Sequence, residues 1–350
     1  VANIIIEKNN FRIPKKLFTE NKDGEKVGVF EARSEREEAD FICTKCKELI
    51  DGGVKSDEIA VLYRANFQSR VLEEAFLALG VPYQMLGTKF FERKEIKDLI
   101  SFVRASINSD TGIDFLRIIN IPPRGIGKTT IEKILAGKEV ELPESTKIKI
   151  NNFKLLLNNF REVLLSSKIS EAIKYIIQKS GIEEMYKNGK EEDSERLENI
   201  MELVSLAKEY DDYSPEEALD KFLTDSSLAS DQDSLHGERS GVKLMTVHSS
   251  KGLEFKYVFV CGLEEDLFPH KKLGGVKQWG EDGEEERRLF YVALTRAGEK
   301  LFLTWARMRT IFGNIQMNSP SEFLDDVPEE YSESEYFVGN TRKPLFSIDF

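Results

Sequence analysis

The sequence contains little that would support a covalent scaffold or a membrane span. Only three cysteines and three histidines occur among its 350 residues, which excludes a disulfide framework and fits a reducing compartment such as the cytoplasm. No apolar run approaches the roughly 18 residues that a membrane-spanning helix needs, and no secretory leader is visible. We therefore expect a cytoplasmic protein with no membrane partner. Because the chain starts with Val1 rather than methionine, we also expect an excised part of a longer polypeptide.

Two of the cysteines form a pair that could suggest metal binding. Cys43 and Cys46 are three residues apart within a helical pattern, with no second such pair and no histidine cluster. A structural zinc site needs about four ligands. We therefore predict that both thiols are packing residues and that the chain has no metal site.

An excess of basic residues is also absent. The 62 acidic residues outnumber the 50 basic ones, which gives a net charge of −12, so the whole chain lacks the basic footprint of a nucleic-acid binder. The charge is uneven, because residues 88–154 carry a net +4 and residues 155–237 a net −10. A polyanion could meet the first stretch and would be repelled by the second. On charge alone, solvated helix faces remain the simpler interpretation.

The two ends of the chain have the pattern of an α/β domain. Ser34 followed by Glu37 predicts a capping box at the start of a helix that ends at Gly52, and Gly80 ends a second helix. Strands separated by helices predict a parallel sheet with helices on both faces. The strand patterns cover residues 26–32, 58–63, 242–247, 256–262 and 300–305.

The middle of the chain has helical periodicity throughout, without a strand pattern of similar quality. An all-helical block inside an α/β pattern predicts an inserted domain, so that the α/β domain is discontinuous. We expect the α/β domain to comprise residues 1–87 and 238–327 and the helical domain residues 88–237. The acidic, broken segment 328–350 is expected to be a flexible tail.

Two segments carry polar residues in a pattern that suggests chemistry. The run Thr246-Val-His-Ser-Ser-Lys-Gly-Leu-Glu-Phe255 lies between two strands, where a polar loop at the carboxyl edge of a sheet can bind a ligand. In Glu284–Arg296, Glu284 and Arg288 form an i,i+4 pair, and Arg296 lies about two turns beyond Arg288 on the same helix face. A rigid arginine can stabilise charge during phosphoryl transfer. A plain surface loop and a salt-bridged amphipathic helix explain the same residues.

A third segment, Gly125-Ile-Gly-Lys-Thr-Thr130, is similar to the end of a phosphate-binding loop. The first glycine of the full pattern is replaced by Pro122, which argues against a complete loop. Two glycines before a helix start can still expose backbone N–H groups to one phosphate of a nucleic acid. A plain turn between helices is equally compatible with these residues.

Together these segments resemble, in order, the C-terminal half of the UvrD/PcrA/Rep family of superfamily 1 DNA helicases, and within it the PcrA group. Val61–Arg70 resembles motif IVa, Phe90–Asp98 the next conserved block, Thr246–Phe255 motif V and Glu285–Ala297 motif VI. The resemblance extends to about residue 327. It implies a RecA-like parallel-sheet domain of the P-loop NTPase type, called 2A, that is interrupted by the all-helical insertion domain 2B.

The resemblance also implies roles for individual residues. Arg296 corresponds to the catalytic arginine that reaches the γ-phosphate of ATP, Glu254 to the acid at the nucleotide ribose, and Gly252 to a neighbour in the ATP site. The residues implied to contact single-stranded DNA are Arg64, Asn66, Thr246, His248, His270 and Phe312. Those implied to contact duplex DNA are Arg124, Gly125, Ile126, Gly127, Lys128 and Thr129.

The family pattern implies an ATP-dependent 3′→5′ DNA helicase that moves along single-stranded DNA and unwinds duplex in repair or replication. Its partners would be single-stranded and duplex DNA, the N-terminal 1A/1B half of the same polypeptide, and repair or replication proteins. ATP and Mg²⁺ would be its cofactors.

No GxxxxGK[ST] run occurs in this chain, and its one Asp-Glu pair, Asp57-Glu58, precedes a strand instead of following it. The Mg²⁺ ligands would therefore lie outside this chain, and the chain alone is expected to be inactive as an ATPase. A non-catalytic DNA-binding or partner-docking module remains an alternative, as does the helicase subunit of a helicase–nuclease.

Overall fold

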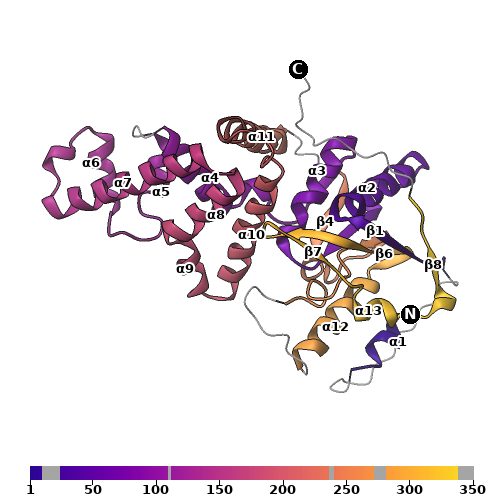
Figure 1. The fold of residues 1–350 in the computed structure, drawn as a ribbon. Helices are drawn as coiled ribbons and strands as arrows, with labels where there is room; N and C mark the ends of the chain where they lie inside the picture. The colour runs from indigo at the N-terminus through magenta and orange to yellow at the C-terminus, as the bar shows by residue number, and fades with distance from the viewer. Residues whose placement is uncertain (10–23, 109–111, 236–239, 272–280, 338–350) are drawn as a thin grey trace. The chain divides into compact units, whose positions relative to one another are not determined.

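The computed structural model describes residues 1–9, 24–108, 112–235, 240–271 and 281–337. Backbone contacts divide the chain into two compact units (Figure 1). The first unit comprises residues 1–89, 236–310 and 315–350, and the second comprises residues 90–235 and 311–314.

An eight-stranded sheet forms the centre of the first unit. The strands lie in the order β3-β4-β2-β5-β6-β1-β8, and β7 pairs with β6 off this path. Every pairing along the path is parallel, which confirms the expected fold class. The strands are β1 (Val27–Ser34), β2 (Ile59–Tyr63), β3 (Tyr83–Met85), β4 (Val242–Thr246), β5 (Phe255–Val260), β6 (Ala297–Ile311), β7 (Asn314–Met317) and β8 (Ser332–Ser334).

Helices cover both faces of this sheet, and each face has its own hydrophobic core. Helices α2 (Glu35–Asp51) and α3 (Ser69–Leu79) lie together on one side, and α1 (Ala2–Ile6), α12 (Glu281–Leu294) and α13 (Glu322–Asp325) on the other (Figure 1). In β2, Val61 packs with the first group and Leu62 with the second. A strand buried on both faces needs an unbroken apolar run, which Ile59–Tyr63 supplies.

The helix ends follow their capping residues. The Ser34 hydroxyl accepts a hydrogen bond from the Glu37 backbone N–H, which is one half of the predicted capping box. The Glu37 carboxylate accepts instead from Arg33, and this hydrogen bond lowers its pKa. Gly80 ends α3 with a φ of +63°, a left-handed conformation that favours glycine.

The segment 240–243, which leads into β4, is held by hydrogen bonds to the Asp57 carboxylate. The Asp57 carboxylate accepts from the Lys243 ammonium at 2.6 Å, the Gly241 N–H at 3.0 Å and the Ser240 hydroxyl at 2.9 Å. These bonds lower the pKa of Asp57 to about 2, with the Lys243 hydrogen bond as the largest cause. Asp57 precedes β2, so its role here is to anchor the start of β4.

The second unit is helical between residues 90 and 235, with no strand in its described part of that range. Its core contains the aromatic rings of Phe102, Phe115, Phe153 and Phe160, which contact one another edge-on or tilted. The helices are α4 (Lys94–Ile107), α5 (Ile113–Ile118), α6 (Lys128–Leu135), α7 (Glu144–Ser166), α8 (Ile169–Ser180), α9 (Ile182–Lys187), α10 (Glu191–Lys208) and α11 (Pro215–Leu235).

The structure corrects the expectation of a flexible tail from residue 328. Strand β8 pairs in parallel with β1, and the Phe337 ring packs edge-on against Phe30 and Phe41. This part of the chain is therefore tied to the sheet; residues 338–350 lie outside the described residues. Strand β6 is also longer than the six residues predicted.

Neither a metal-binding cluster nor a membrane-spanning helix occurs among the described residues. No group of three or more His, Cys, Asp or Glu residues is placed to hold a metal ion. None of the helices there has the length and apolar character needed to cross a bilayer. Cys43 and Cys46 are buried in the core beside α3, which agrees with packing residues.

Candidate nucleotide and nucleic-acid sites

The predicted site residues of the first unit lie at two opposite edges of the sheet. Arg64 and Asn66 follow β2, and His248 follows β4, so these residues lie at the carboxyl edge. Glu254 directly precedes β5 and Arg296 directly precedes β6, which places both at the amino edge. The polar loop that was expected at the carboxyl edge therefore begins there and ends at the other edge.

At the amino edge, the structure brings Arg296 against the end of this loop. The Arg296 guanidinium donates to the Leu253 carbonyl at 2.6 Å, the Val292 carbonyl at 3.0 Å and the Thr295 hydroxyl at 3.0 Å. Its own carbonyl accepts from the Phe255 N–H at 2.9 Å. Arginine has five N–H donors, so this fixed side chain uses three of them on its described neighbours and retains capacity for an anionic oxygen.

The position of Arg296 differs from the sequence expectation. Helix α12 ends at Leu294, and Arg296 lies in the turn before β6 instead of on the helix face of Arg288. The ion pair predicted between Arg288 and Glu284 is present, with a nitrogen–oxygen distance of 3.6 Å. Arg296 therefore reaches the sheet edge from the turn that follows the helix, and not from one face of the helix.

The other two residues predicted for the nucleotide lie next to Arg296 in the chain fold. Gly252 and Glu254 are both exposed. Gly252 has a φ of +85°, which favours glycine, and a Cβ atom there would meet no atom within 4 Å. This part of the edge is open to a ligand and combines a carboxylate with a fixed guanidinium.

At the carboxyl edge, two polar groups from distant parts of the chain meet on Glu286 of α12. The Arg64 guanidinium donates to the Glu286 carboxylate through Nε at 2.9 and 3.0 Å and through Nη2 at 2.6 Å. The same carboxylate accepts from the His270 backbone N–H at 3.0 Å. The Arg64 N–H in turn donates to the Gln68 side chain at 3.1 Å. Arg64 and the backbone at His270 are thus held by one acid that the sequence did not single out.

The remaining residues predicted to contact single-stranded DNA are Asn66, Thr246, His248 and Phe312. The Thr246 hydroxyl lies 3.0 Å from the Ser249 hydroxyl. His248 is exposed and is the first residue of the short helical turn that contains Ser249. Asn66 is half-buried. Phe312 belongs to the second unit, where it has a φ of +53°, a conformation that is rare for a bulky side chain.

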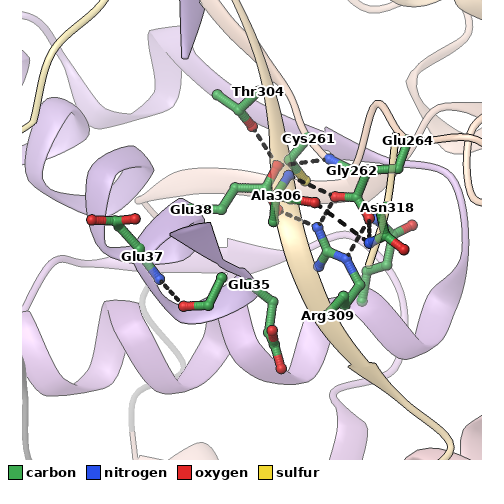
Figure 2. Close-up of polar contacts among 12 residues, drawn as sticks. Glu35, Glu37, Glu38, Cys261, Gly262, Glu264, Thr304, Ala306, Arg309 and Asn318 are labelled. Carbon is green, nitrogen blue, oxygen red and sulfur yellow. Dashed lines mark hydrogen bonds and ion pairs between the residues drawn. The ribbon is translucent and has the colours of Figure 1, made fainter. Parts of the chain in front are cut away.

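A buried charge network behind the carboxyl edge was missed by sequence reasoning. Figure 2 shows Arg309 of β6 between Glu38 of α2 and Glu264, which follows β5. The Arg309 guanidinium donates to Glu38 at 2.6 Å and to both oxygens of Glu264. The Glu38 carboxylate also accepts from the Thr304 hydroxyl at 2.7 Å and the Gly262 N–H at 2.9 Å.

Burial sets the electrostatics of this network. All three charged side chains are at most 8 % exposed. Burial raises the pKa of the Glu264 carboxyl, while the Arg309 guanidinium opposes this change. Burial would lower the pKa of Arg309, but Glu264 and Glu38 outweigh it and raise that pKa. The network fixes the loop after β5 to the neighbouring strand and helix.

In the second unit, the predicted duplex-DNA turn divides into inward and outward residues. The Arg124 guanidinium lies over the Phe153 ring at 4.6 Å and donates to the backbone carbonyls of residues 118, 121, 122 and 180. Ile126 is fully buried. Burial lowers the pKa of Arg124 to about 10. Both residues hold the turn, and their predicted contact with duplex DNA stays a prediction.

The outward part of the turn is exposed. Gly125, Gly127, Lys128 and Thr129 all face solvent, and the Lys128 side chain is 91 % exposed. Gly127 is the N-cap of α6, and Asn120 holds the turn by accepting from the Arg124 and Ile126 N–H groups. Gly125 has a φ of +70°, whereas Gly127 is extended. The backbone conformation therefore favours glycine at position 125 but not at position 127.

Comparison with known proteins places this arrangement in a family. Residues 1–308 match the model of the UvrD-like helicase C-terminal domain. The chain is 42% identical over 353 residues to the ATP-dependent DNA helicase PcrA of Staphylococcus aureus strain MRSA252, which covers 95% of this chain and 48% of that protein. It is 41% identical over 366 residues to PcrA of Staphylococcus epidermidis strain RP62A, which covers 99% of this chain and 49% of that protein.

The chain thus spans about half the length of the curated relatives it matches. A solved structure of the C-terminal domain of a possible DNA helicase from Lactobacillus plantarum WCFS1 covers 89% of this chain and 86% of that chain, with 10% identity and a TM-score of 0.35. The family match and the two PcrA relatives carry the assignment. The chain belongs to the UvrD-like helicase C-terminal domain family.

Proposed function

We propose that this chain is the C-terminal motor half of an ATP-dependent 3′→5′ DNA helicase, in which the first unit is domain 2A and the second unit is domain 2B. The observation that carries the proposal is Arg296, fixed beside the exposed Gly252–Glu254 segment in a chain whose relatives are named as ATP-dependent DNA helicases. Phosphoryl transfer depends on positioned charges more than on covalent chemistry. A guanidinium held by three hydrogen bonds meets that requirement.

The nucleotide would lie against the amino edge of the sheet. Arg296 would face the γ-phosphate, and Glu254 the ribose, with Gly252 keeping the approach open. ATP binding also needs Mg²⁺ and a phosphate loop. The described residues include no acidic cluster suited to a metal ion, so the Mg²⁺ ligands would come from an N-terminal 1A/1B half. Alone, this chain would not hydrolyse ATP.

Single-stranded DNA would lie along the carboxyl edge, with duplex DNA at the turn before α6. The His270 ring in the first unit and, separately, the Phe312 ring in the second unit can each stack on an unpaired base without sequence preference. Arg64, Asn66, Thr246 and His248 would supply polar contacts. Gly125, Gly127, Lys128 and Thr129 are the exposed candidates for duplex phosphates, whereas Ile126 is buried and the half-buried Arg124 donates to carbonyls of its own unit.

The proposal places the protein in the cytoplasm, acting in repair or replication, where other proteins of those processes would be its partners. A single set of assays tests it. The full-length gene product should hydrolyse ATP faster when single-stranded DNA is added, and should unwind a duplex with a 3′ tail in preference to one with a 5′ tail. The 350-residue chain should show no turnover above background. Failure of the full-length protein to respond to DNA would refute the proposal.

A further inference from the structure

We infer that Glu286 is a positioning residue that links the carboxyl edge of the sheet to Arg296 through helix α12. This inference rests on the proposed function, because it concerns how DNA at one edge affects ATP turnover at the other. Four sets of contacts within the first unit support it.

The first set comprises the hydrogen bonds of the Glu286 carboxylate. Glu286 accepts three hydrogen bonds from Arg64 and one from the His270 N–H. The Glu286 and Arg64 side chains are only 13 % and 15 % exposed. Paired N–H donors of one guanidinium on one carboxylate fix orientation as well as distance. Any movement of Arg64 toward a DNA phosphate must therefore stretch or break its bonds to α12.

The second set ties the His270 loop to the same helix. The Phe268 ring meets the Phe290 ring of α12 edge-on at 5.8 Å, and Phe290 stacks on Phe323 at 5.1 Å. Phe268 and Phe290 are fully buried. Together with the His270–Glu286 hydrogen bond, this packing joins the loop to α12 at two points.

The third set concerns the body of α12. Leu289, Phe290, Ala293 and Leu294 are buried in the core beneath the sheet. Close-packed side chains transmit displacement rather than absorb it. From Glu286 to its last residue, Leu294, the helix advances eight residues, about 12 Å at the rise of an α-helix. The helix is thus a stiff element that leads from Glu286 to the turn that holds Arg296.

The fourth set is at the far end. Arg296, two residues beyond α12, donates to the Leu253 carbonyl at 2.6 Å and accepts from the Phe255 N–H at 2.9 Å. A shift of α12 therefore acts directly on the segment that contains Glu254. Coupling of this kind is reciprocal for binding, so nucleotide at Arg296 would also alter the hold of Glu286 on Arg64.

The test is a pair of isosteric variants on α12 of the full-length gene product. Glu286→Gln removes the charge that holds Arg64. Glu285→Gln removes a charge one residue away, from an exposed side chain whose carboxylate contacts Arg288. For each protein we would measure the dissociation constant for a single-stranded oligonucleotide, and the ratio of ATP turnover with and without it. The thermal unfolding midpoint checks folding, and Glu286→Ala is the second variant.

Glu286→Gln should reduce the stimulation of ATP turnover by DNA about 5–150-fold, the usual size of a coupling between sites. Its affinity for DNA should stay equal or become tighter, because Arg64 is no longer neutralised. Glu285→Gln should behave as the unmodified protein. In Arg64→Ala, adding Glu286→Gln should have no further effect on stimulation, since both act on one link.

The inference is overturned if Glu286→Gln keeps full stimulation, or if affinity and stimulation fall together in proportion. The second result would mean that Glu286 only shapes the binding surface. An unmodified protein that shows no stimulation by DNA would instead refute the proposed function, which makes the two failures distinguishable.

Discussion

Replacing Arg309 by methionine should destabilise the first unit strongly, because two buried carboxylates lose their partner. The side chains of Arg309, Glu38 and Glu264 are 8 %, 4 % and 0 % exposed. Breaking a buried pair by removing one member costs about 3–5 kcal/mol. We therefore expect Arg309→Met to lower the free energy of unfolding by about 3–5 kcal/mol, a large part of the 5–15 kcal/mol typical of a domain.

The pH dependence separates buried charge from lost packing. Without the guanidinium, burial raises the pKa of the Glu264 carboxyl further above its unfolded value. A carboxyl whose folded pKa is raised costs stability fully above that pKa, and the cost shrinks as the pH falls toward the unfolded pKa. The deficit of Arg309→Met should therefore be largest at neutral pH and decrease toward pH values of about 5.

Denaturant unfolding followed by the fluorescence of Trp305, which is buried in β6 of the same unit, measures this change. Trp279 would be replaced by phenylalanine in every protein compared, so that the fluorescence comes from Trp305 alone. Adding Glu38→Gln and Glu264→Gln to Arg309→Met should recover stability, because the uncompensated charges are gone. A deficit below about 1 kcal/mol, or one that does not change with pH, would refute the reasoning.

Three further predictions concern Arg124, Gly125 and Gly241. Arg124→Ala should destabilise the second unit by about 2–4 kcal/mol in denaturant unfolding, and Arg124→Lys should not restore it, because a single ammonium cannot reach the same carbonyls. Gly125→Val should weaken duplex binding by the chain at low salt, whereas Gly127→Val should alter the turn far less, since only Gly125 has a positive φ; equal affinities for both variants would leave a plain turn between helices. Gly241→Ala should lower stability by about 1–3 kcal/mol, because its Cβ would lie 2.8 Å from the Tyr83 backbone, and hydrogen exchange at β3 would report the loss.

The sheet was largely predictable because local signals and tertiary structure agree. The apolar run Ile59–Tyr63, the cap at Ser34 and the stop at Gly80 each act through neighbours in sequence. The short strands β3 and β8 were missed because three residues are too few for periodicity to show. Their formation depends on a partner strand that is distant in the chain.

The candidate sites were predictable as motifs but not as contacts. Arg296 and Glu254 were identified by their segments, yet only the fold shows that both lie at the amino edge. Glu286 reads as one of three consecutive acids on a helix, and no local pattern distinguishes it from Glu285. Its partner Arg64 is 222 residues away. Such pairs depend on topology, which is why sequence reasoning missed them.

Arg124 shows a structural role that its motif did not indicate. Two glycines and two basic residues in a turn predicted a phosphate contact for Arg124. The carbonyls left unpaired by the turn instead recruit its guanidinium, and the Phe153 ring covers it. A charged residue at a turn can form hydrogen bonds with backbone carbonyls as readily as with a bound ligand. One clue was available in the sequence, since the two prolines before Arg124 cannot donate hydrogen bonds.

The central claim is that Arg296 stabilises charge during ATP hydrolysis, and ATP turnover by Arg296→Ala in the full-length gene product tests it most directly. Arg288→Ala, which removes an arginine paired with Glu284 and Glu285 on the same helix, is the matched control. We expect Arg296→Ala to bind ATP within a few-fold of the unmodified protein and to lose about 10³–10⁵ in DNA-stimulated turnover, while Arg288→Ala retains it. A loss below about tenfold would contradict the account and leave Arg296 as a residue that only closes the turn after α12.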